Sequence, residues 1–108
     1  MRTFMLDTKY CKEQATIRFG KYLNNDETVI SFTDMDGQPL LTATVNLDAY
    51  GEHPKEGCVF IKDWSENEGT YDSLRALLII GPSQRKVAVA NGLEAYECPL
   101  LVRPQDGE

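Results

Sequence analysis

The chain has 108 residues, of which 42% are hydrophobic and 26% are charged, and its net charge at pH 7 is −6. This length supports one globular domain, and the composition argues against a fibrous repeat or a largely disordered chain. The shortage of Lys and Arg argues against nonspecific binding to nucleic acid or to an anionic membrane. We expect a single domain over residues 1–108, with residues 1–13 and 103–108 at its periphery.

Three strands are predicted in the first half of the chain, where apolar residues alternate with polar ones. The first two cover residues 14–23 and 27–34, and an Asn-Asn-Asp turn between them makes a hairpin. A turn that ends in Asp36-Gly37 leads to the third strand, over residues 40–47, which has one apolar face. Residues 48–57 lack apolar periodicity and predict an exposed connection.

The second half predicts one more strand, one helix and a hairpin. Residues 58–62 are apolar on both faces and predict a short central strand. The Ser65-x-x-Glu68 capping box and the helical spacing of Tyr71, Leu74, Leu77 and Leu78 predict a helix over residues 66–80. Residues 86–90 and 93–102 flank Asn91-Gly92 and predict a hairpin. The expected fold class is α+β, a mostly antiparallel sheet of five to seven strands with one principal helix packed on it.

The length of the apolar runs bears on the location of the protein, and the number and spacing of the cysteines bear on whether they form disulfides. No run is long enough to cross a bilayer, and the stretch near Met1 is too short for a signal peptide, so we expect a cytoplasmic protein. Three cysteines without CxxC spacing argue against a disulfide framework and a zinc ribbon. Cys58 and Cys98 fall in predicted strands. Cys11 lies outside the predicted core and is expected to be the thiol that reacts quickly. It is either an incidental surface thiol or one whose pKa Lys9 and Lys12 lower.

Residues that support catalysis are scarce. His53 is the only histidine, and it stands beside Pro54 with no Ser or Cys nearby in sequence. No glycine spacing matches a phosphate-binding loop. Asp34 and Asp36 are spaced as at the start of an EF-hand loop, but Val45 stands where that loop needs Glu. We therefore expect no enzymatic activity, no metal and no cofactor; a small hydrolase or metal-dependent enzyme is the alternative that the carboxylates leave open.

Negative charge is concentrated in the middle of the chain. Residues 22–74 carry eleven acidic and two basic groups, a net of −9, whereas residues 1–21 have a net of +3. Trp64 lies among carboxylates, and an aromatic residue in such surroundings is typical of an anchor at a protein interface. It also precedes the predicted helix, where an apolar residue commonly packs on the first helical turn. The two roles are compatible. The candidate partner-binding residues are Asp34, Asp36, Asp63, Trp64, Glu66, Glu68 and Asp72.

Three segments carry a resemblance to a protein family: residues 17–22 (IRFGKY), 43–47 (ATVNL) and 59–69 (VFIKDWSENEG). The chain resembles a family of small bacterial, plasmid and phage proteins that share a FIKDWSENEG-like block. The resemblance covers roughly residues 15–102. It implies a setting on mobile elements, where small acidic proteins often block host machinery, and it assigns no activity to any residue.

Three functions follow as hypotheses. The first is an acidic inhibitor or adaptor, of anti-CRISPR or anti-restriction type, whose carboxylates stand in for phosphates on a basic protein surface. The second is a structural or regulatory interaction domain unrelated to host defence. The third is the small enzyme named above. In the first two the partner is a protein, and the chain itself binds no nucleic acid.

Overall fold

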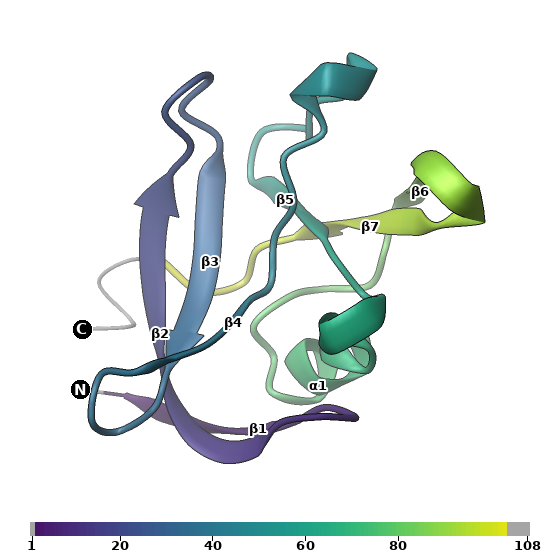
Figure 1. Ribbon diagram of the computed structural model, residues 1–108. Coiled ribbons are helices and arrows are strands. Elements are labelled where there is room, and N and C mark those ends of the chain that lie inside the picture. Colours follow the sequence, from purple (N-terminus) through teal and green to yellow (C-terminus); the bar gives the residue numbers. More distant parts are fainter. Residues whose placement is uncertain (1, 104–108) are drawn as a thin grey trace.

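The computed structural model describes residues 2–103, which form seven strands in two antiparallel sheets (Figure 1). The first sheet has the order β1-β2-β3-β4 and contains β1 (Thr3–Asp7), β2 (Lys12–Lys21), β3 (Thr28–Thr33) and β4 (Pro39–Thr42). The second has the order β5-β7-β6 and contains β5 (Cys58–Ile61), β6 (Arg85–Ala88) and β7 (Glu94–Pro99). The α+β class is confirmed, with the strands divided between two sheets.

Short helices complete the described part of the chain. The α-helix α1 covers Thr70–Ala76, and 3-10 turns cover η1 (Asp48–Tyr50), η2 (Ser65–Asn67) and η3 (Ala90–Gly92). Helix α1 lies between β1 and the second sheet: the N–H of Asp7 donates to Ser73 Oγ at 3.1 Å, and the rings of Tyr71 and Tyr96 stack with centroids 4.6 Å apart. None of the helices within residues 2–103 is long and apolar enough to span a membrane.

The segment after β4 joins the two sheets. The N–H of Ala43 donates to the carbonyl of Ile30 in β3, and the carbonyl of Ala43 accepts from the N–H of Lys62, both at 2.8 Å. Thr44 then bridges to Ile61 at the edge of β5. The strand expected over residues 40–47 therefore ends at Thr42, because the backbone leaves the first sheet there and makes only an isolated bridge to the second.

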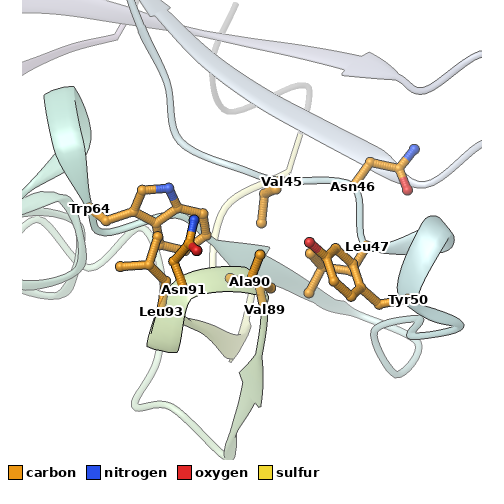
Figure 2. Close-up of a pocket in the computed structure, with 9 residues that line it drawn as sticks. All are labelled: Val45, Asn46, Leu47, Tyr50, Trp64, Val89, Ala90, Asn91 and Leu93. Carbon is orange, nitrogen blue, oxygen red and sulfur yellow. The ribbon is translucent and has the colours of Figure 1, made fainter.

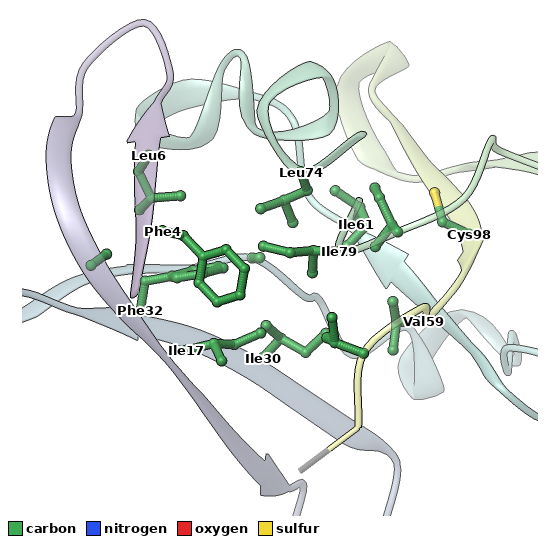
Figure 3. Close-up of a cluster of buried hydrophobic side chains, with 14 residues drawn as sticks. Phe4, Leu6, Ile17, Ile30, Phe32, Val59, Ile61, Leu74, Ile79 and Cys98 are labelled. Atoms are coloured by element: carbon green, nitrogen blue, oxygen red, sulfur yellow. The ribbon is translucent and has the colours of Figure 1, made fainter. Parts of the chain in front are cut away.

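One apolar core lies between the two sheets (Figure 3). Its fully buried members include Ile30 and Phe32 from the first sheet, Ile61 from the second, and Leu74 from α1. A smaller cluster on the other face of the second sheet contains Leu47, Phe60, Val87 and Ala95, with Val45, Trp64 and Val89 packed against it.

The expectation that residues 1–13 are peripheral is wrong. Strand β1 pairs with β2 from Thr3↔Thr16 to Asp7↔Lys12, and Phe4 and Leu6 are only 5% and 0% exposed. Their alternation with exposed Met5 places them on the inner face of the sheet. Of residues 103–108, Arg103 is exposed and the others lie outside the described residues.

The helix is shorter than expected, and the capping box is absent. Ser65 sits in η2 with a positive φ of 54°, and Gly69 adopts a left-handed φ of 93° immediately before α1. No side chain caps α1 at Gly69, and Glu68 lies at the end of η2. The left-handed backbone at Gly69 is incompatible with one continuous helix from residue 66.

Both predicted turn motifs are present. Gly37 adopts a φ of 85° in the turn between β3 and β4. Asn91 and Gly92 adopt φ values of 63° and 75° between β6 and β7, and the N–H of Val89 donates to the carbonyl of Leu93 at 2.8 Å. Both hairpins use residues that tolerate positive φ.

Candidate protein-binding site

The seven candidate residues lie in two separate places. Asp34 and Asp36 belong to the turn between β3 and β4, whereas the other five lie in the segment from Asp63 to Asp72. In Figure 1 the turn is the loop at the lower left, and α1 lies apart from it, to the right. The sequence motifs therefore do not assemble into one patch.

Asp34 shapes its own turn. Its Oδ1 accepts hydrogen bonds from the N–H groups of Asp36 and Gln38, each at 2.9 Å. Such contacts are the ordinary role of Asp in a turn. The exposed carboxylate of Asp36 makes no ion pair or hydrogen bond within the described chain, so it is the free charge of this turn.

Asp63 holds the junction between β5 and α1. Its Oδ1 accepts from the N–H groups of Gly69 and Tyr71, each at 3.0 Å. Burial raises the pKa of Asp63, and it outweighs these N–H bonds, which lower it. The carboxylate satisfies backbone groups at the start of the helix and is structural rather than free.

Two neighbouring carboxylates are paired with lysines. Glu66 Oε1 lies 2.6 Å from Lys62 Nζ, and this hydrogen bond lowers the pKa of Glu66. Glu68 Oε2 lies 3.2 Å from Lys9 Nζ. Asp72 is exposed and makes no ion pair within residues 2–103. Of the acidic residues in this segment, Asp72 is therefore the free charge.

Outside the seven candidate residues, a further group of charged side chains lies where the β2–β3 turn meets η1. His53 Nδ1 lies 2.5 Å from Glu27 and its Nε2 lies 3.6 Å from Asp48. The hydrogen bond to Glu27 raises the pKa of His53 against the opposing effect of burial. Asn24, from the same turn as Glu27, accepts from Asn46 at 2.8 Å. Sequence reasoning missed this group because its members are separated along the chain and meet only in the fold.

Arg85 and Glu97 extend this group into the second sheet. Glu97 is fully buried and pairs with Arg85, whose guanidinium also contacts Glu52 at 3.0 Å. Burial acts to raise the pKa of Glu97, but the N–H of Lys55 and the Arg85 guanidinium outweigh it and lower the pKa. Through the N–H of Lys55 and the carboxylate of Glu52, Glu97 and Arg85 hold the loop before β5 against β6 and β7.

Trp64 lines a pocket above the smaller apolar cluster (Figure 2). The pocket has a volume of about 210 Å³. Figure 2 shows Trp64 at one end and Tyr50 at the other, with aliphatic side chains between them. Its lining residues are Val45, Asn46, Leu47, Tyr50, Trp64, Val89, Ala90, Asn91 and Leu93. Trp64 packs against this cluster and forms part of the pocket wall.

The cysteines differ in burial. All three are free thiols; Cys98 is buried, and Cys11 and Cys58 are half-buried. Burial raises the pKa of Cys98 to about 12 and also raises the pKa of Cys11, where Glu13 adds to the effect. The alternative in which Lys9 and Lys12 lower the pKa of Cys11 is therefore wrong. Over the described range, no group of three or more His, Cys, Asp or Glu side chains is placed to hold a metal ion.

In comparisons with protein-family models, curated proteins and solved structures, nothing matches the chain.

Proposed function

We propose that this chain is a non-enzymatic module that binds a basic surface of another protein. Four exposed carboxylates carry the proposal. They belong to the acidic middle of the chain and make no ion pair or side-chain hydrogen bond within residues 2–103: Asp26, Asp36, Glu56 and Asp72. Because no cation neutralises them internally, their charge is available to attract a basic partner.

The distribution of these charges favours a protein partner over nucleic acid. Asp26, Asp36 and Glu56 lie in three different loops and Asp72 lies in α1, so the negative field spreads over the surface between residues 22 and 74, whose net charge is −9. Such a field repels phosphates and steers basic proteins toward productive encounters.

The specific form of this proposal is an inhibitor of a host defence enzyme. CRISPR effectors hold nucleic acid in positively charged channels, and a surface with spread carboxylates suits a channel of that kind. The resemblance of residues 59–69 to small phage and plasmid proteins supports the same setting. An interaction domain unrelated to defence is the alternative that the test below distinguishes.

The test is affinity capture from a bacterial lysate, with the full chain as bait at low and high salt. The comparison variant is Asp26→Asn/Asp36→Asn/Glu56→Gln/Asp72→Asn. The control is Asp7→Asn/Lys12→Gln, which removes an exposed pair 2.8 Å apart and keeps the net charge. We expect the wild type and the control to retain a basic protein at low salt, and the fourfold variant to lose it.

The identity of the captured protein separates the two forms of the proposal. A nuclease or CRISPR subunit supports the inhibitor, and another basic protein supports the interaction domain. Equal capture by the fourfold variant, or capture of no basic protein, contradicts the whole proposal.

A further inference from the structure

The pocket between Trp64 and Tyr50 has the size of a side-chain site. Its volume of about 210 Å³ is below the range of about 300 to 1,000 Å³ that is typical of small-molecule pockets. Most of its lining is aliphatic, including Val45, Leu47 and Leu93. A single large apolar side chain of a partner fits this description better than a cofactor or metabolite.

The two aromatic walls have the character of binding anchors. Trp64 is half-buried and Tyr50 is 51% exposed, so each has a packed side and an accessible side. Trp and Tyr are enriched among the residues that dominate binding energy at protein interfaces. Trp64 packs against the cluster of Leu47, Phe60, Val87 and Ala95, which supports this wall.

Negative charge accompanies the Tyr50 end of the pocket. Asp48 stands in η1 between the lining residues Leu47 and Tyr50, and it shares His53 with Glu27: His53 lies 3.6 Å from Asp48 and 2.5 Å from Glu27. At the Trp64 end, Lys62 pairs with Glu66 and the carboxylate of Asp63 binds backbone N–H groups, so that end adds no free charge. Two carboxylates against one histidine favour a partner segment that carries positive charge.

We propose that this pocket receives one large apolar side chain of the partner, from a segment in which Lys or Arg flanks that side chain. The apolar group enters between Trp64 and Tyr50, and a flanking cation meets Asp48. This inference rests on the proposed function and adds to it the anchor by which a basic surface is recognised.

Because Trp64 is the only tryptophan of the chain, its fluorescence reports directly on the pocket. The probes are three synthetic peptides: Lys-Lys-Phe-Lys-Lys, Lys-Lys-Ser-Lys-Lys and Glu-Glu-Phe-Glu-Glu. We expect the first to change Trp64 emission and to bind at least about tenfold more tightly than either of the others, a difference of the size expected for one anchor residue.

Variants of the full chain test the location. Ala90 is exposed and lines the pocket, so Ala90→Leu fills it. Ala76→Leu makes the same change at an exposed position at the end of α1 and is the control. Asp48→Asn removes the charge at the Tyr50 end, and its control is Glu13→Gln, which removes an exposed carboxylate of β2 outside the acidic middle of the chain. We expect Ala90→Leu to weaken the first peptide about tenfold or more, Asp48→Asn to weaken it severalfold, and both controls to leave it unchanged.

Several outcomes overturn the inference. If all Lys-containing peptides bind equally and Ala90→Leu has no effect, basic recognition stands and the pocket is not its anchor. If Glu-Glu-Phe-Glu-Glu binds as tightly as Lys-Lys-Phe-Lys-Lys, the site does not select a basic partner. A response to none of the peptides up to about 1 mM also overturns it. Self-association that Ala90→Leu abolishes would assign the pocket to a second copy of the chain.

Discussion

Asp63 is the side chain that organises the start of the helix. The sequence motif assigned this task to Ser65 and Glu68, but Asp63 accepts the two N–H bonds, and Glu68 instead pairs with Lys9. We expect Asp63→Ala to lower the free energy of unfolding by about 1 to 2 kcal/mol, since two backbone donors lose their acceptor. Asp63→Asn keeps an acceptor oxygen and should recover part of the loss.

Glu68→Ala is the matched control for this prediction. It removes a carboxylate whose ion pair is about half exposed on both sides, and such pairs contribute about 0 to 1 kcal/mol. Urea denaturation of the three variants gives the comparison. A larger loss for Glu68→Ala than for Asp63→Ala would show that Glu68, and not Asp63, caps the helix.

The three thiols should label in an order set by burial. Cys98 is 0% exposed and has a pKa of about 12, so we expect it to stay unlabelled in the folded protein and to react only after unfolding. Cys11 and Cys58 are half-buried with raised pKa values and should react slowly but measurably near neutral pH. Mass spectrometry of native and denatured samples resolves the order, and rapid native labelling of Cys98 would contradict the packing of β7.

At the scale of elements, α1 contributes to the core through Leu74. Leu74 is 0% exposed, whereas Leu78, which the helical pattern also placed inside, is 69% exposed with a positive φ of 60°. We expect Leu74→Ala to cost about 2 to 5 kcal/mol and Leu78→Ala to change stability by less than about 0.5 kcal/mol, as measured by urea denaturation. Similar losses in the two variants would indicate that the helix continues to residue 80.

His53 joins the β2–β3 turn to η1, and this connection depends on pH. Its pKa is raised above 6.5 in the folded protein, mainly by Glu27; Asp48 and Glu52 add to the effect, and Arg85 contacts its carbonyl. A raised pKa means that the stabilisation is present below the unfolded value and is lost as pH rises through the folded value.

The corresponding variant is His53→Gln. We expect its melting temperature to fall below that of the wild type at about pH 6, and the difference to shrink at about pH 8.5. Thermal melts at both pH values measure it. A difference that is constant across this range would show that His53 acts only through neutral hydrogen bonds.

Sequence patterns predicted elements well where local chemistry decides them. Asn91-Gly92 and Asp36-Gly37 specify turns because their residues tolerate positive φ, and both turns are present. The predicted helix is too long because the spacing of Leu74, Leu77 and Leu78 is helical. The break at Gly69 is not visible in that spacing, since it depends on contact with Thr8 and Lys9, which are far away in the chain. The pairing of β1 with β2 and the passage of Ala43 between the sheets are likewise long-range features.

The whole molecule combines two sheets around one core with an acidic surface. The net charge and its concentration in residues 22–74 are properties of the sequence alone. The fold decides which carboxylates are free: it pairs Glu66, Glu68 and Glu97 with cations, commits Asp63 to the backbone, and leaves Asp36 and Asp72 unpaired within the described chain. The sequence therefore predicts that the site is acidic, but it does not predict which carboxylates are free and which are paired.

The most direct test of recognition by these free carboxylates is the association rate of the captured partner as a function of salt. The Debye length falls from about 10 Å at 0.1 M to about 3 Å at 1 M, so attraction by exposed charges weakens over this range. The account predicts a steep fall in rate for the wild type, and a slow, nearly salt-independent rate for Asp26→Asn/Asp36→Asn/Glu56→Gln/Asp72→Asn. Equal rates for the two proteins at low salt would contradict it.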